Sequence, residues 1–156
     1  MHIKTGTPKQ RLEYIFSETA EGNWQPFLDA LAEDAEWMVI GSTGWSKTYR
    51  GKPQILNDLF APLRRVLAPP RKSHAFHMIA EGDMVAVQGQ GDNRTRDGRR
   101  YTNTYCWIFA FRGAQVRAVT EYADTELMRS ALGEPLRHAA EAQRGVESSA
   151  RESATP

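Results

Sequence analysis

The fold is decided by the stretch Tyr101-Thr-Asn-Thr-Tyr-Cys-Trp-Ile-Phe-Ala-Phe111, in which aromatic residues fill the odd-numbered positions apart from Asn103. A period of two is typical of a β-strand with one buried face. The opposite face carries Thr102, Thr104, Cys106, Ile108 and Ala110. Because bulky rings remove more apolar surface from water, we expect the aromatic face to line a hollow covered by helices. The stretch therefore predicts a long strand over residues 100–111.

Further strands are predicted on both sides of this one. Residues 74–80 and 84–92 alternate in the same way and are joined across Glu81-Gly-Asp83, which suits a hairpin. Turns at residues 96–99 and 112–114 connect the long strand to its neighbours, the second of which is residues 115–123. One more strand is expected at residues 35–40. Consecutive hairpins predict an antiparallel meander.

Helical periodicity appears mainly before this meander. Apolar residues recur at helical spacing in residues 9–21, in a short segment after Asn23, and in residues 53–67, where Pro62 is expected to kink or break the helix. A last short helix is expected from Asp124, its N-cap, to Leu132. The sequence thus predicts an α+β fold with helices on one face of an antiparallel sheet.

Length and composition restrict the possible partners. The chain has 156 residues and a net charge of +1, which suits one domain, expected over residues 1–133, and gives no electrostatic footprint for nucleic acid or a membrane. The polar tail 134–156 is expected to be a frayed helix or disordered. Cys106 is the only cysteine, and neither a signal peptide nor an apolar run of about 18 residues occurs, so a cytoplasmic protein is expected.

No metal or cofactor is predicted. The sequence contains no Gly-rich phosphate loop, and no cluster of acids and histidines has metal-ligand spacing. His74 and His77 are three apart on a strand and are expected on opposite faces. The pairs Arg64-Arg65 and Arg71-Lys72 could steer an anionic substrate, although a solvated face is the default interpretation. A small apolar molecule is the expected ligand.

Three segments carry a resemblance to a known family: Leu31-Ala-Glu-Asp-Ala-Glu-Trp37, Tyr49-Arg-Gly-Lys52, and the stretch Gly98 to Phe111 followed by Val119-Thr-Glu-Tyr-Ala-Asp-Thr125. Together with the order of elements, they resemble the nuclear transport factor 2-like superfamily and its SnoaL-like, ketosteroid isomerase-related family. The resemblance covers residues 8–132. It implies an α+β fold in which a cone-shaped curved antiparallel sheet is packed with three N-terminal helices around one apolar pocket. That superfamily includes isomerases, cyclases, epoxide hydrolases, dehydratases and noncatalytic binders, so function depends on the pocket side chains.

Strand alternation and the resemblance together give the expected pocket residues. The expected ligand-binding residues are Trp37, Val39, Gln88, Gln90, Trp107, Val119 and Ala123, and the expected catalytic residues are Glu121, Tyr105, Asn103 and His74. Burial would raise the pKa of Glu121 towards a range useful for proton transfer. Tyr105 and Asn103 could donate hydrogen bonds to a substrate oxygen, and His74 could be a second acid or base. The alternatives are a structural acceptor for Glu121, core ordering for Tyr105 and Asn103, and a surface position for His74.

The resemblance also narrows the chemistry. Epoxide hydrolases of the superfamily need an Asp and an Arg where this chain has Gln90 and Gln88, and ketosteroid isomerases need acids where it has Val39 and Trp107. An acid on the last strand, as in SnoaL-like polyketide cyclases, matches Glu121. The predicted function is therefore proton transfer on a small apolar carbonyl metabolite, leading to cyclisation, isomerisation or dehydration. The alternative is a noncatalytic small-molecule binder or an assembly protein that forms a homodimer through the outer sheet face.

Overall fold

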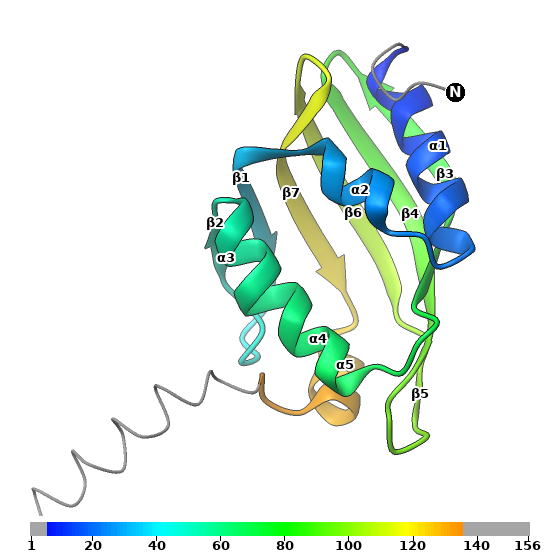
Figure 1. The fold of residues 1–156 in the computed structure, drawn as a ribbon, viewed down its shortest axis with the longest axis vertical. Coiled ribbons are helices and arrows are strands. Elements are labelled where there is room, and N and C mark those ends of the chain that lie inside the picture. The colour runs from blue at the N-terminus through cyan, green and yellow to red at the C-terminus, as the bar shows by residue number, and fades with distance from the viewer. Residues whose placement is uncertain (1–5, 136–156) are drawn as a thin grey trace, which may run out of the picture.

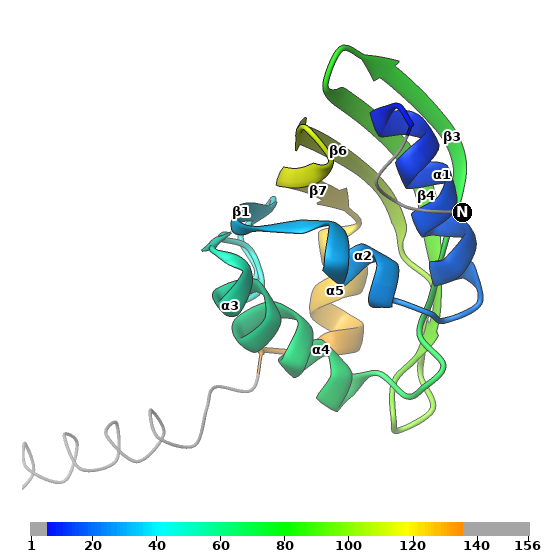
Figure 2. The same ribbon diagram turned by 45° about the horizontal axis from the view of Figure 1, so that its top comes forward.

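A single curved sheet forms the frame of the protein in the computed structural model, which describes residues 6–135. Its strands are β1 (Leu31–Val39), β2 (Thr48–Arg50), β3 (Lys72–Glu81), β4 (Met84–Arg94), β5 (Arg100–Tyr101), β6 (Thr104–Arg112) and β7 (Gln115–Ala123). The strand order is β2-β1-β7-β6-β4-β3, with β5 paired to β4. Figures 1 and 2 show the sheet curling into a half-barrel. The predicted meander of the four long C-terminal strands is confirmed.

Helices cover the concave side of this sheet. They are α1 (Pro8–Ala20), α2 (Gln25–Ala30), α3 (Lys52–Gln54), the π-helix η1 (Ile55–Phe60), α4 (Ala61–Val66) and α5 (Thr125–Leu132). Figure 2 shows α1, α2 and the α3–α4 segment over the hollow and α5 beneath it at one end. The predicted α+β architecture is confirmed. The predicted tail lies outside the described residues from position 136 onward.

The third helix runs through Pro62 instead of breaking there. The chain is helical from Lys52 to Val66, and the turn ahead of the proline is widened, so that the Ala61 N–H donates to the Leu56 carbonyl. A proline ring would collide with the carbonyl four residues earlier in a regular α-helix. The π-helical turn relieves this conflict. The expected break is therefore replaced by a bulge within one continuous helix.

The long aromatic strand is interrupted near its start. The prediction of one strand over residues 100–111 is wrong, because β5 ends at Tyr101 and β6 begins at Thr104. Between them the Asn103 side chain pairs with the backbone of Asp124, accepting from its N–H at 3.0 Å and donating to its carbonyl at 3.0 Å. Asp124 also caps α5, as predicted. The interruption thus joins this end of the sheet to the last helix.

Strand β1 inserts beside the far end of the meander. It pairs in parallel with β7, which places Trp37 opposite Val119 and Val39 opposite Glu121. The other edge of β1 pairs with β2, which contains Tyr49. The Tyr49 hydroxyl donates to the carbonyl of Trp45, in the loop before β2, at 2.9 Å. The Trp45 indole is buried and donates to the Gly133 carbonyl at 2.7 Å. These contacts fix the loop against the end of α5.

No helix within residues 6–135 is both long and apolar enough to cross a membrane.

Candidate functional site

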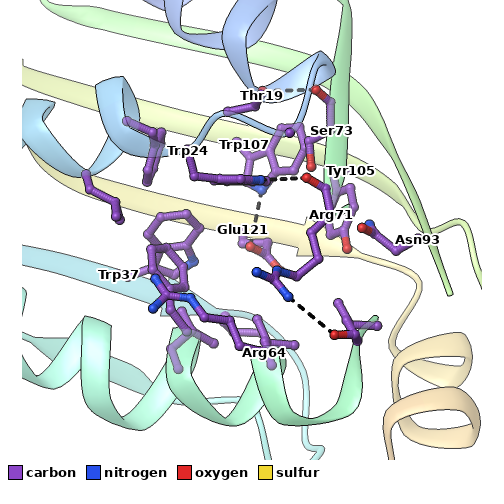
Figure 3. Close-up of a pocket in the computed structure, with 18 of the residues that line it drawn as sticks. Thr19, Trp24, Trp37, Arg64, Arg71, Ser73, Asn93, Tyr105, Trp107 and Glu121 are labelled. Atoms are coloured by element: carbon purple, nitrogen blue, oxygen red, sulfur yellow. Dashed lines mark hydrogen bonds between the residues drawn. The ribbon is translucent and has the colours of Figure 1, made fainter. Parts of the chain in front are cut away.

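A cavity of about 510 Å³ lies between the concave face of the sheet and the helices. Small-molecule sites commonly measure about 300–1,000 Å³. Its aromatic wall includes Trp24, Phe27, Trp37, Phe60, Trp107 and Phe109. Its polar groups include Arg64, Arg71, Ser73, Asn93, Tyr101, Tyr105 and Glu121, most of which are visible in Figure 3. An apolar space with few polar groups suits a small, mostly hydrophobic ligand.

Glu121 is the acid of this cavity. β7 pairs with β1 on one side and β6 on the other, which places Glu121 between Val39 and Trp107. Trp107 Nε1 donates a hydrogen bond of 3.2 Å to Glu121 Oε2. Among the described residues, none of the salt bridges involves this carboxylate. A cationic partner would mark a structural acid, whereas its absence in an open cavity favours proton transfer.

The surroundings of Glu121 change its acidity. Burial raises the pKa of Glu121 to about 7, against the opposing effect of the indole N–H groups of Trp107 and Trp37. Desolvation dominates because only the two indole groups oppose it and no arginine or lysine contributes to the shift. A carboxyl group with this pKa is present in both protonation states near neutral pH. It can therefore accept a proton in one step and return it in the next.

The Trp37 indole N–H is a buried donor without a regular hydrogen bond in the described residues. It helps to lower the pKa of Glu121, but the contact falls outside regular hydrogen-bond geometry. Trp37 Nε1 is accordingly the buried side-chain polar atom of residues 6–135 that has no hydrogen-bond partner. Buried donors are nearly always satisfied in folded proteins, so such a group marks a position where a ligand can bind.

Tyr101 supplies a second donor. Its hydroxyl oxygen accepts hydrogen bonds from Asn103 Nδ2 at 3.2 Å and from the Tyr105 hydroxyl at 3.3 Å. The hydroxyl proton of Tyr101 is used in neither of these hydrogen bonds. Tyr101 lines the cavity, so this proton is available to a ligand there. Burial raises the pKa of Tyr101 to about 12, despite the two hydrogen bonds it accepts, so the proton is retained. Tyr101 rather than Tyr105 offers a hydroxyl proton to a ligand.

Five of the expected site residues come together in the cavity wall: Trp37, Val39, Tyr105, Trp107 and Glu121. The Tyr105 ring stacks on Trp107, with centroids 4.5 Å apart and planes 14° apart. Val119 and Ala123 share the concave face with Glu121, but they pack into the core around the cavity and do not line it. The aromatic face of β6 was thus predicted correctly.

Asn103 is placed differently from the prediction. Its side chain is fully buried, and its amide makes hydrogen bonds to Tyr101 and to both backbone groups of Asp124. It does not line the cavity. An amide committed to these partners cannot also donate to a substrate oxygen without breaking one of them. Asn103 is connected to the cavity only through its hydrogen bond to the hydroxyl of Tyr101, which lines the wall.

The predicted face of β4 is wrong. Gln88 is exposed and Gln90 half-buried on the outer side, while Val85, Val87 and Gly89 point inward. Directly paired residues share a face of the sheet, and β4 pairs Val87 with Trp107 and Gly89 with Tyr105. The glycine is required there, because a Cβ on Gly89 would lie 2.8 Å from the Trp107 ring and would also collide with the backbone.

His74 also lies on the outer side of the sheet. In β3, His74 pairs with Gln90 of β4 and therefore faces away from the cavity. Its neighbour Ser73 faces the cavity. The register shifts between Ala75 and His77, which leaves Phe76 as an extra residue. A bulge of this kind resets the alternation. His77 therefore pairs with Gln88 and lies on the same face as His74, contrary to the prediction.

Several residues that line the cavity are not among those predicted from the sequence. Asn93 and Ser73 line the wall where β4 and β3 meet, and Tyr101 was placed on the aromatic face without a role. A period of two through Val85 and Val87 ends on Asn93 and could have indicated it. Arg64 and Arg71, whose default interpretation was a solvated face, border the cavity.

Across residues 6–135, no three His, Cys, Asp or Glu side chains are grouped so as to hold a metal ion.

Comparison with known proteins identifies the architecture. A family model described as a SnoaL-like domain matches residues 12–119, and no curated protein sequence matches. The structure of an NTF2-like protein of unknown function from Burkholderia pseudomallei is 17% identical, with a TM-score of 0.70 over 82% of this chain and 98% of that one. Similarity at this level of identity shows the fold.

Two further structures are similar. A proposed SnoaL-like polyketide cyclase from a Jannaschia species is 14% identical, with a TM-score of 0.65 over 83% of this chain and 93% of that one. A proposed isomerase from Bacillus subtilis is 17% identical, with a TM-score of 0.67 over 83% of this chain and 96% of that one. The family match ends two positions before Glu121, so the role of this acid has to be judged from its own geometry.

Proposed function

Since this chain belongs to the SnoaL-like domain family, we propose that it is an enzyme that moves a proton on a small apolar carbonyl compound, with Glu121 as the acid/base group. The result would be cyclisation, isomerisation or dehydration. The observation that carries this proposal is a carboxyl group in an apolar cavity, with indole donors and no cationic partner among the described residues, whose pKa is raised to about 7 by burial.

The arrangement supports a simple sequence of proton movements. The Glu121 carboxylate takes a proton from the carbon next to the substrate carbonyl. The electron pair of that C–H bond forms a C=C bond to the carbonyl carbon, and the π pair of the C=O bond moves onto the oxygen to give an enolate. The free proton of Tyr101 and the unpartnered N–H of Trp37 are donors suited to that oxygen. The protonated Glu121 then returns its proton to another carbon or to a leaving hydroxyl group. One group thus acts as base and then as acid.

The named relatives agree with this class of reaction. One is described as a proposed polyketide cyclase and another as a proposed isomerase. Both reactions can begin with removal of a proton beside a carbonyl. At 14% and 17% identity these structures support the class of reaction for this chain without identifying its substrate.

The test uses 5-nitrobenzisoxazole, a carbon acid that reports a base in an apolar pocket. The base takes the proton on carbon 3, the C–H electron pair completes a nitrile, and the N–O bond breaks to give a coloured phenolate. We expect kcat/KM to rise with pH to a plateau, with a midpoint near 7. Glu121→Gln should lower kcat/KM by about 100-fold or more, the usual contribution of a positioned base.

The matched control is Glu126→Gln, which removes an exposed acid of α5 that pairs with Arg129. This variant should retain the wild-type rate. If Glu121→Gln retains activity within about tenfold of wild type, or if wild type is no faster than acetate at equal concentration, Glu121 is not the base.

The alternative function is noncatalytic binding or assembly, and the outer face of the sheet favours the assembly part. The large exposed hydrophobic residues are Met38, Phe76, Ile79, Met84 and Tyr122, all of which lie on strands of this sheet. Phe76 and Ile79 are 65% and 64% exposed, which is unusual for side chains of their size. A homodimer through this face would cover them.

Sedimentation equilibrium tests the dimer. Wild type should sediment as a dimer, and Phe76→Lys should shift the equilibrium to the monomer while leaving elimination of 5-nitrobenzisoxazole intact. A monomeric wild type would contradict the homodimer.

A further inference from the structure

Two arginines, Arg64 and Arg71, line the cavity. Arg64 belongs to α4, and Arg71 lies directly before β3. Both line the cavity, and Figure 3 shows the Arg71 side chain extending towards Glu121 and that of Arg64 extending towards Trp37. The Trp24 indole donates to the Arg71 carbonyl at 2.8 Å and so fixes the backbone from which this side chain extends. Arg71 is thus half-buried at the cavity, and the exposed Arg64 borders it from the solvent side.

Neither guanidinium forms an ion pair with an acid of residues 6–135. Other arginines of residues 6–135 pair with acids, among them Arg50 with Glu36 and Arg112 with Asp34. No such pair in the described residues includes Arg64 or Arg71, and the Arg71 side chain makes one long hydrogen bond of 3.4 Å to the Leu67 carbonyl. The donors needed to grip an anion are therefore available.

The charges near Arg71 repel one another. Burial lowers the pKa of Arg71, and the neighbouring cations Arg64 and Arg96 lower it further. Arg96 is already engaged, since it donates to the carbonyls of Arg64 and Arg65. Gathering like charges at a partly desolvated place is unfavourable unless an anion binds among them. Planar guanidinium groups match the geometry of a carboxylate.

Arg64 and Arg71 do not change the pKa of Glu121. The pKa of Glu121 is set by burial and two indole groups, with no contribution from an arginine. All three residues line one cavity whose wall is largely aromatic. A ligand that satisfies both ends would carry an anionic group at one end and its reacting carbon at the other.

We propose that the substrate is a hydrophobic acid, whose carboxylate binds Arg71 and Arg64 while its apolar body fills the aromatic cavity. This inference rests on the proposed function only in taking the cavity as the substrate site. It adds a chemical class to the substrate and gives the two arginines a role in binding and orientation.

The test compares 2-naphthoate with its neutral isostere, 2-naphthamide, by isothermal titration calorimetry at pH 6 and low ionic strength. At this pH Glu121, with its pKa of about 7, is largely uncharged. We expect naphthoate to bind about tenfold more tightly or better, which is the effect of one or two charge-assisted hydrogen bonds at a partly exposed site. Salt should weaken the binding of naphthoate and not that of naphthamide.

Arginine variants test which side chains cause the preference for naphthoate over naphthamide. Arg71→Gln and Arg64→Gln should each reduce the preference for naphthoate, and the double variant should abolish it while leaving naphthamide binding unchanged. Arg117→Gln removes an equal charge at an exposed position of β7 outside the cavity and should retain the preference. Because Arg64 is exposed, its substitution should leave folding intact, which circular dichroism checks.

The inference and the proposed function can fail independently. Glu121→Gln should keep the preference for naphthoate, since the arginines hold the carboxylate. Equal affinity for the two probes, no binding of naphthoate, or a preference that survives the double variant would each overturn the inference. A preserved preference together with failure of the elimination test would leave an acid-binding pocket without the proposed catalysis.

Discussion

Replacing Glu121 by glutamine should stabilise the protein, and increasingly so as the pH rises. Glutamine keeps the shape of the protonated acid and an oxygen that can accept from Trp107, but it never ionises. The ordinary pKa of glutamate is 4.5, and burial raises that of Glu121 to about 7. At about 1.4 kcal/mol for each pH unit, this corresponds to about 3 kcal/mol. We reduce it to about 2 kcal/mol, because Glu121 is only half-buried.

The sign follows from which form the fold prefers. A folded-state pKa above the unfolded one means that the protonated acid stabilises the fold fully below pH 4.5, and that this contribution is lost as the pH rises through about 7. Glutamine does not ionise, so the variant loses no stability at this position as the pH rises. Its free energy of unfolding should therefore be near that of wild type below pH 4.5 and higher by about 2 kcal/mol above pH 7.

Urea unfolding from pH 4.5 to 8.5 measures this difference directly. Glu126→Gln is the control for removing one negative charge at an exposed site. A difference between Glu121→Gln and wild type that stays flat with pH, or that falls as the pH rises, would refute a desolvated carboxyl group at Glu121. The result does not depend on any substrate.

Three further outcomes are expected. Trp107→Phe removes the indole donor that lowers the pKa of Glu121, so the midpoint of the pH profile for 5-nitrobenzisoxazole should move above that of wild type; an unchanged midpoint would contradict the role of this hydrogen bond. Asn103→Ala loses the three hydrogen bonds of its side chain and should lower the free energy of unfolding by about 2–3 kcal/mol in urea, while kcat falls much less than in Glu121→Gln. Gly89→Ala places a methyl group against the Trp107 ring and the His74 carbonyl and should cost about 1–3 kcal/mol, measured as a lower Tm; a neutral effect would contradict the tight approach.

The sequence was sufficient for the frame of the fold and for the acid of the site. Alternating aromatic residues in a long segment leave little doubt about which face is buried, because the difference in apolar area between the two faces is large. The family resemblance, together with strand alternation, predicted that Glu121 faces inward from β7, and the residue does line the cavity. The SnoaL-like resemblance, which rested on these segments, is confirmed by the family match.

The errors arose where local alternation carries too little information. In β4, Ala86 and Gln88 alternate with Val87 and Gly89, and a glycine gives no sign of facing inward until its partner ring is known. In β3, the extra residue Phe76 resets the alternation, which no periodic rule can place. A register known to one residue would have corrected β4, because Trp107 lies opposite Val87.

Local sequence patterns do not predict that β1 pairs in parallel with β7. They also do not predict that Arg64 and Arg71 line the cavity. Val39 lies beside Glu121 only because β1 joins the sheet 82 positions earlier in the chain than the acid it flanks. Arg71 reaches the cavity because the chain crosses from α4 to the opposite edge of the sheet. Such placements depend on the packing of distant elements, which charge pairs in a sequence do not reveal.

The hydrogen bond between Trp45 and Gly133 also limits how the protein can be engineered. Trp45 lines the cavity, and its indole N–H depends on a carbonyl just beyond the last helix. A shortened protein ending at Leu132 would leave this buried donor without its acceptor, at a cost of about 1–3 kcal/mol. Fusion partners, purification tags or surface attachment are better placed after Pro135, where the contact that closes the cavity wall is kept.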